Sequence, residues 1–137
     1  MMRFEVIEHT ADAGIIGYGS DLKEAFANAA YGMFSLIADL EDLNNDFSRD
    51  IDIQAPDREA LLVAWLNELV YIFDVDRVIM NVFEITGLSE GRLQAKVYGE
   101  KIDLSRHQLK TAVKAATYHS LKIEESNGVR VQVILDI

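Results

Sequence analysis

The chain has 137 residues, of which 50% are hydrophobic, and its formal net charge is -10. This length suits one domain with an ordinary core, and no apolar run of about 18 residues is present that would cross a membrane. The absence of cysteine excludes thiol catalysis, disulfides and cysteine-based zinc sites. With 13 basic and 23 acidic residues, the chain also lacks the basic surface that independent nucleic-acid binding requires.

The first predicted elements are two strands, residues 3–10 and 14–19, in which apolar residues alternate or run together. Because they are only a few positions apart, we expect an antiparallel pair joined by a tight turn at HTADAG. His9, Thr10 and Asp12 gather three polar groups at this turn. Loop tips held by strands often form sites, although Asp12 could equally accept a backbone N–H as an Asx-turn.

Two helices are predicted, at residues 20–39 and 57–74, because apolar residues recur there at the i, i+3, i+4 spacing. Ser20 or Asp21 is expected to cap the first helix. Asp57, which follows the single proline, is expected to open the second.

Five further strands complete the predicted elements, and the last two are joined by a hairpin turn at SNG. Two helices among strands connected mostly by hairpins predict an α+β fold, with a mostly antiparallel sheet of about seven strands and two main helices in a single domain. The five strands are residues 47–55, 78–88, 92–102, 113–125 and 129–137.

The remaining motifs lack the spacing of the standard phosphate, zinc and calcium sites, whereas Ser, His and Asp are all present and only geometry would decide whether they form a nucleophilic triad. The glycines of residues 14–19 lack the Lys-Ser/Thr ending of a phosphate-binding loop. His9, His107 and His119 lack the paired spacing of a zinc helix, and His107 is expected to be a surface loop residue. The acidic residues 39–46 lack the glycine and glutamate positions of an EF-hand and are predicted to form a solvated connection.

Three polar side chains are predicted to lie beside apolar faces. Asn67 and Glu68 flank the apolar stripe of the second helix, and both are expected to be solvated, although Glu68 is placed to reach a sheet edge. Lys114 is expected on the strand face opposite Val113 and Ala115. Small neighbours would leave it either recessed there or extended towards solvent.

The chain ends in VILDI, and the alternation of residues 129–137 puts Asp136 on the face opposite the valines. This carboxylate lies within one residue of the chain-terminal carboxylate. Two such charges repel each other unless a cation, donor groups or bulk water relieve them. A solvated chain end and a cation site therefore both remain open for Asp136.

Four blocks of this sequence together resemble the archease family: HTADAG near the start, LLVAWLNELVYIF in the middle, VKAATYH, and the final VILDI. They occur in the same order over nearly the whole chain, so we expect an archease-like domain over residues 1–137. One position departs from the pattern, because Glu8 precedes the histidine where aspartate is expected in many relatives. An acidic role at position 8 is retained as an expectation.

The resemblance implies a protein that is not itself an enzyme and that activates the tRNA-splicing RNA ligase, which joins tRNA exon halves. Archeases promote guanylylation of a histidine in that ligase, support its multiple turnover and broaden its nucleotide use. The implied partner is therefore a protein, and we expect neither direct nucleic-acid binding nor membrane association. The N-terminal residues lack a signal-peptide pattern, so the expected location is the cytoplasm.

The resemblance also implies a bound calcium ion, with another divalent cation as an alternative. Carried over by motif, the metal ligands are Asp12, Asp136 and the backbone carbonyl of Ile137. Carboxylate and carbonyl oxygens are the donors that calcium prefers. The residues expected to support this site or to act on the partner are Glu8, His9, Glu68 and Lys114.

Two other functions remain open. One is a chaperone-like modulator of other RNA-modifying enzymes, such as a methyltransferase, in which the cation is only structural. The other is a free-standing metal-dependent hydrolase that uses His9, Asp12 and His119, although no nucleophile–base pair is visible. Copurification with ligase or methyltransferase activity separates the activator from the modulator, and phosphoester turnover by the isolated protein would support the hydrolase.

Overall fold

The computed structural model describes residues 2–8 and 12–137, and within these the chain forms seven strands and two helices. The strands divide into two antiparallel sheets, one in the order β1-β2-β7-β6 and the other in the order β3-β5-β4. The predicted α+β fold is confirmed, whereas the division into two sheets was not anticipated. The elements are β1 (Phe4–Glu8), β2 (Asp12–Gly19), α1 (Leu22–Ile37), β3 (Phe47–Gln54), α2 (Arg58–Asp76), β4 (Val78–Leu88), β5 (Arg92–Lys101), β6 (Ala115–Glu125) and β7 (Val129–Asp136).

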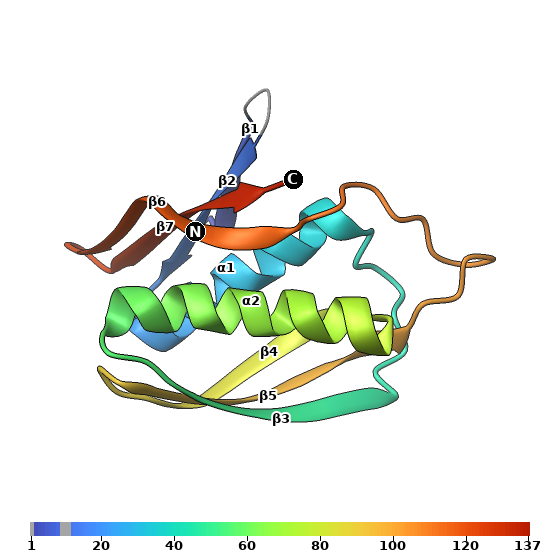
Figure 1. Ribbon diagram of the computed structural model, residues 1–137, viewed down its shortest axis with the longest axis horizontal. Coiled ribbons are helices and arrows are strands. Elements are labelled where there is room, and N and C mark those ends of the chain that lie inside the picture. The colour runs from blue at the N-terminus through green and yellow to red at the C-terminus, as the bar shows by residue number, and fades with distance from the viewer. Residues whose placement is uncertain (1, 9–11) are drawn as a thin grey trace.

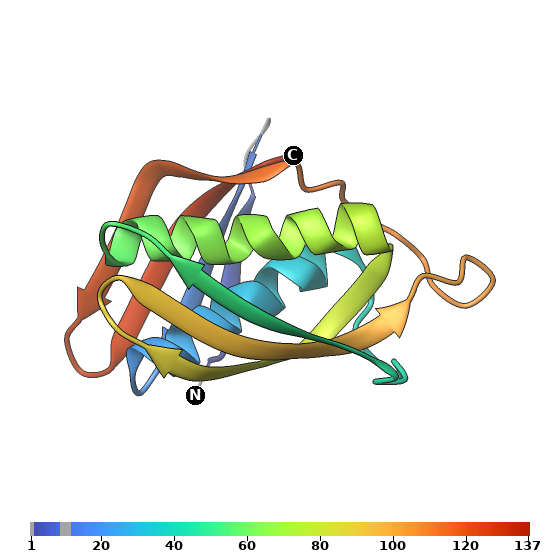
Figure 2. The ribbon, with the colours of Figure 1, turned by 60° about the horizontal axis from the view of Figure 1, so that its bottom comes forward.

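Both helices lie between the two sheets, so the molecule has a central helical layer (Figures 1 and 2). Helix α1 packs against β2 of the four-stranded sheet and against β4 of the three-stranded sheet, and α2 packs against β6 and against the three-stranded sheet. Neither helix in this described part of the chain is long and apolar enough to cross a membrane.

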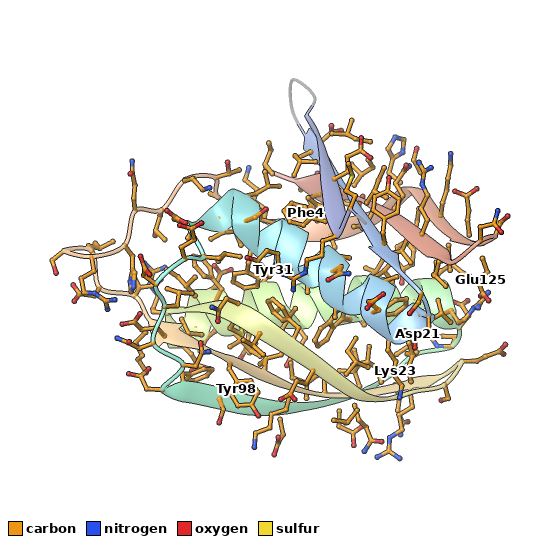
Figure 3. The ribbon with its side chains drawn as sticks, turned by 180° about the vertical axis from the view of Figure 1, so that it is seen from behind. Phe4, Asp21, Lys23, Tyr31, Tyr98 and Glu125 are labelled. Carbon is orange, nitrogen blue, oxygen red and sulfur yellow. The ribbon has the colours of Figure 1, made fainter. Side chains whose placement is uncertain are left out.

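Of the two caps predicted for α1, Ser20 and Asp21, the structure has Asp21, whose side chain accepts a hydrogen bond from the Glu24 N–H at 2.9 Å. Figure 3 shows Asp21 at this start of the helix and Tyr31 further along it, next to Phe4 of β1. The Phe4 and Tyr31 rings have centroids 5.7 Å apart. This pair fixes the edge strand β1 onto the helical layer.

Helix α2 carries buried apolar residues on more than one side, because it has a sheet on either side of it. Asp57 caps its start by accepting from the Ala60 N–H at 2.8 Å. Its single tryptophan, Trp65, is fully buried and donates its indole N–H to the Phe26 carbonyl of α1 at 3.0 Å. This hydrogen bond ties the two helices together inside the core.

Strands β6 and β7 form the predicted hairpin, in which Asn127 and Gly128 take positive φ angles of 54° and 100°. The pairing of the two strands is interrupted between Thr117 and Lys122, where Ser120 also has a positive φ of 52°. The first residues of β6 therefore form a short length of regular pairing that ends at an irregularity.

Candidate functional site

The two aspartates that the sequence predicts as metal ligands lie opposite each other across neighbouring strands. Asp12 of β2 pairs with Asp136 of β7, and Ala115 of β6 pairs with Asp136 on its other side. Residues directly opposite in an antiparallel pair have Cβ atoms about 4.5–5.5 Å apart and point to the same face. The two carboxylates therefore share one face at the end of the four-stranded sheet where β7 finishes (Figure 1).

This face is the one turned away from the helices. The next row of paired residues, Ala13, Leu135 and Ala116, is buried, and successive side chains on a strand alternate between faces. Asp12 was expected in a turn, but it is the first residue of β2. Its backbone position is therefore set by strand pairing.

The two carboxylates differ in their surroundings. Asp136 is exposed, whereas Asp12 is half-buried and its Oδ1 atom is buried without a hydrogen-bond partner among the described residues. Burying a charged oxygen without a donor is unfavourable, and a second carboxylate across the strand adds repulsion. A hard cation would relieve both penalties, and oxygen ligands are the ones that calcium prefers. The two carboxylates are therefore of the donor type that suits a calcium ion.

Ile137 follows β7 directly, and its half-buried side chain packs against the core. Among the residues that the structure describes, no group of three or more His, Cys, Asp or Glu side chains is arranged to hold a metal ion. The aspartate pair supplies two carboxylates. A cation bound here would need further ligands from main-chain oxygens such as that of Ile137, from water, or from side chains outside this described set.

Lys114 lies next to the aspartate pair through its main chain. Its N–H donates to the Asp136 carbonyl oxygen at 2.8 Å, and its side chain is exposed just before β6 begins. The lysine is thus not recessed between its small neighbours. The Lys114 side chain thus presents a positive charge to solvent from a residue whose main chain is hydrogen-bonded to Asp136.

The other residues expected near the site are distributed as follows. Glu8 ends β1 and pairs with Ala13, and His9 lies outside the described residues. Glu68 is half-buried on α2. His119, which the hydrolase hypothesis requires, is exposed on β6, and β7 separates that strand from β2 and its Asp12.

Asn67 was expected to be solvated, and this expectation is wrong. Its Oδ1 accepts from the Ala116 N–H at 2.7 Å, and its Nδ2 donates to the Ala116 carbonyl at 3.2 Å. The two residues are 49 positions apart. The helical spacing of the second helix places Asn67 at the edge of the apolar stripe but carries no signal for its partner.

A second polar cluster surrounds Glu100 of β5, which is only 7% exposed. Its carboxylate accepts from the Asn44 N–H at 3.0 Å, forms an ion pair with Arg106, and lies 3.2 Å from His107 Nε2. The Asn44 N–H, followed by Arg106 and His107, lowers the pKa of Glu100 from 4.5 to about 2. These contacts anchor the segment after β5, which leads to Lys114.

His107 lies in a loop as predicted, but the prediction that it is at the surface is wrong. Its side chain is 7% exposed, and Nδ1 accepts from the Asp103 N–H at 2.9 Å while Nε2 faces Glu100. A buried carboxylate from a different element supplies the partner that makes burial of the imidazole favourable. The local sequence around His107 is polar and does not reveal that partner.

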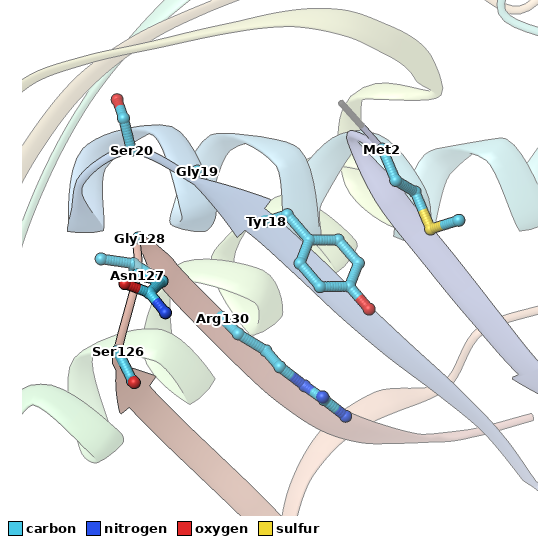
Figure 4. Close-up of a pocket in the computed structure, with 9 residues that line it drawn as sticks. Met2, Tyr18, Gly19, Ser20, Ser126, Asn127, Gly128 and Arg130 are labelled. Carbon is cyan, nitrogen blue, oxygen red and sulfur yellow. The ribbon is translucent and has the colours of Figure 1, made fainter.

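A hollow of about 530 Å³ lies at the opposite end of the four-stranded sheet from the aspartate pair, where Gly19 pairs with Val129 (Figure 4). Arg130 lines this hollow and lies 3.8 Å from Glu124, so its charge already has an acidic neighbour. The aspartate pair, whose buried Asp12 oxygen has no partner among the residues that the structure describes, is therefore the better candidate site.

Comparison with known proteins finds a family model and relatives that match nearly the whole chain. The sequence model of a family described as the archease protein family (MTH1598/TM1083) matches residues 4–137. The protein named archease from Pyrococcus abyssi is 41% identical over 142 residues, and this match covers 100% of this chain and 100% of that protein. The archease of Methanosarcina barkeri is 38% identical over 140 residues, which cover 98% of this chain and 96% of that protein.

Two solved structures have a similar fold. The solution structure of Methanobacterium thermoautotrophicum protein 1598 has a TM-score of 0.85 and 35% identity, with complete coverage of both chains. The crystal structure of a Thermotoga maritima protein, described as an archease and possible chaperone, has a TM-score of 0.64 at 19% identity, covering 100% of this chain and 98% of that one. The second likeness concerns the fold alone. The family match and the close relatives together show that this chain belongs to the archease family.

Proposed function

We propose that this protein is a non-enzymatic activator of the tRNA-splicing RNA ligase, which promotes guanylylation of the ligase and its multiple turnover and broadens its nucleotide use. The observation that carries the proposal is the aspartate pair at one end of the four-stranded sheet, with Lys114 joined to Asp136. Membership of the archease family supports the choice of partner.

The proposed site holds a divalent cation, calcium in the first instance, through Asp12, Asp136 and the main-chain oxygen of Ile137. Such an ion supplies positive charge that offsets the repulsion between the two carboxylates. Asp12 contributes the buried oxygen that lacks a partner among the described residues, and Asp136 contributes the exposed carboxylate. Lys114 contributes a solvent-facing positive charge that can neutralise a phosphate group at the ligase surface.

The charge of the chain supports action through a protein partner, and we propose that this takes place in the cytoplasm. A net charge of -10 disfavours an approach to RNA phosphates but suits docking on a basic protein surface. The activator is proposed to act on the ligase and not to carry out the transfer reaction itself.

A second candidate is a chaperone-like modulator of other RNA-modifying enzymes, such as a methyltransferase. It is favoured by one observation, the description of the Thermotoga maritima protein of similar fold as a possible chaperone. Purification of the tagged chain from its own cells separates the two candidates. Ligase activity in the bound fraction supports the activator, and methyltransferase activity without ligase activity supports the modulator.

The direct test is a ligation assay at limiting ligase and excess RNA, with and without this protein. We expect the wild-type chain to raise the number of turnovers per ligase, and Asp12→Ala, Asp136→Ala and Lys114→Ala to raise it much less. Lys122→Ala is the matched control for Lys114→Ala, because Lys122 is also exposed but lies within β6 and pairs with Gln132, away from the aspartates. A wild-type chain that leaves ligase turnover unchanged would overturn the activator proposal.

A further inference from the structure

Asn67 of α2 satisfies both main-chain polar groups of one residue in the neighbouring sheet. Its carboxamide oxygen accepts from the Ala116 N–H, and its carboxamide nitrogen donates to the Ala116 carbonyl. A side-chain amide has the same donor and acceptor pair as a peptide group. Asn67 therefore binds Ala116 as an adjacent strand would.

The position of Ala116 explains why this contact matters. Strand β6 is at the edge of the four-stranded sheet and has β7 on one side only. Ala116 itself is buried, and buried main-chain groups are unfavourable without a partner. Since α2 covers this edge, Asn67 supplies the partner that a further strand would otherwise provide.

The residues held by Asn67 adjoin the candidate site. Ala115 pairs with Asp136, and the Lys114 N–H donates to the Asp136 carbonyl. This regular pairing is short, because no helix or strand precedes Lys114 directly and the register breaks after Thr117. The Asn67 contact ties this short segment to the central helical layer at Ala116.

We propose that Asn67 is a positioning residue that fixes Lys114 relative to Asp136 by holding Ala116. The consequence for ligase activation rests on the proposed function, whereas the effect on the Lys114–Asp136 hydrogen bond does not. Asn67 has no direct role towards the cation or the ligase in this proposal. It acts through the strand segment of residues 114–116.

Asn28 of α1 offers a matched control. Its Nδ2 donates to the Tyr18 carbonyl of β2 at 2.6 Å, and its Oδ1 accepts from Arg3 at 2.8 Å. It is another helix asparagine bound to a strand main chain of the same sheet, but near the end of β2 opposite Asp12. Asn28 is also more buried than Asn67, so its loss should reduce overall stability at least as much.

The experiment uses the full chain as wild type, Asn67→Ala, Asn67→Asp and Asn28→Ala. Asn67→Asp keeps the side-chain shape and the acceptor for the Ala116 N–H, but it replaces the amide nitrogen that donates to the Ala116 carbonyl with an oxygen. Any effect of this variant therefore comes from the lost hydrogen bond and not from a cavity. Amide hydrogen exchange reports the Lys114–Asp136 hydrogen bond directly. We expect the Lys114 amide to exchange about tenfold faster in both Asn67 variants and at the wild-type rate in Asn28→Ala.

Ligase turnover is measured on the same four proteins. Both Asn67 variants should lose most of the activation, and Asn28→Ala should keep it. Wild-type exchange of Lys114 in both Asn67 variants would overturn the positioning role, as would equal acceleration in Asn28→Ala. If the wild-type chain does not activate the ligase, the proposed function fails, and Lys114 exchange still decides the role of Asn67.

Discussion

Asp136 is the residue whose removal most directly tests the cation site. Asp136→Ala removes an exposed carboxylate opposite Asp12, so without calcium the free energy of unfolding should change by less than about 0.5 kcal/mol. Loss of the repulsion between the Asp12 and Asp136 carboxylates would even raise the free energy of unfolding slightly. Calcium should raise the Tm of the wild-type chain because it binds the folded form, and the variant should lose most of that gain. Thermal unfolding of the wild type and of Asp136→Ala, each in chelator and in calcium, measures the stability without calcium and the gain that calcium gives.

Asp50→Ala is the control for this experiment. Asp50 is also an exposed strand aspartate, but it lies on β3 in the other sheet and pairs with Lys96. This variant should keep the full calcium-dependent rise in Tm. Retention of the same rise by Asp136→Ala would show that Asp136 is a solvated strand end and not a ligand.

Glu100 should make the stability of the fold depend on pH in the acid range. Its folded-state pKa of about 2 lies below the ordinary value of 4.5, because Asn44, Arg106 and His107 stabilise the carboxylate. A lowered folded pKa contributes stability that is present above the unfolded value and is lost as the pH falls from 4.5 towards 2. Glu100→Gln should therefore lose less stability across this window than the wild type.

Urea unfolding at several pH values between 2 and 4.5 measures this difference. Glu90→Gln serves as the control, since Glu90 is an exposed carboxylate in the turn between β4 and β5. The free energy of unfolding of Glu90→Gln should change with pH as that of the wild type does. Parallel curves for the wild type and Glu100→Gln would contradict the assignment of this acid sensitivity to Glu100.

At the scale of elements, the contact between α1 and β2 depends on the absence of a side chain at Gly17. A β-carbon there would lie 2.7 Å from the Ala29 nitrogen and closer still to the Ala25 carbonyl oxygen. Both atoms belong to the helix main chain, which cannot rotate away as a side chain can. Helix α1 therefore lies against the four-stranded sheet at a distance that only glycine permits.

Gly17→Ala should accordingly push α1 away from β2 and lower the free energy of unfolding by at least about 1–3 kcal/mol. Gly91→Ala is the matched control, because the nearest atom to its added carbon is the Ala55 carbonyl oxygen at 3.3 Å. That variant should change stability by less than about 1 kcal/mol. Urea denaturation measures the free energy of unfolding of both variants. Equal losses in Gly17→Ala and Gly91→Ala would show that the α1–β2 contact adjusts easily to an added side chain.

At the scale of the whole molecule, charge governs which partners can approach. Because acidic residues outnumber basic ones by 23 to 13, the isolated chain should form no detectable complex with tRNA at physiological salt and protein concentrations up to about 100 µM. Fluorescence anisotropy with labelled tRNA measures this. A micromolar complex that weakens steeply with added salt would contradict the argument from net charge.

The sequence by itself determined the elements and their local ends. Apolar spacing predicted both helices and all seven strands, because the period of buried residues depends on how one element faces a core. Cap residues were equally readable, since Asp21 and Asp57 bond to N–H groups three residues later. The four motif blocks led to the archease family in the same way, because each is a contiguous stretch of chain.

Only the tertiary structure decided which elements meet and which polar side chains find partners. The division into two sheets, the pairing of Asp12 with Asp136, and the contacts of Asn67 and His107 all join residues from different elements. Local periodicity reports that a side chain faces inward or outward but not what lies opposite it. The burial of His107 and the bond from Asn67 to Ala116 depend on that opposite surface, which chain topology creates.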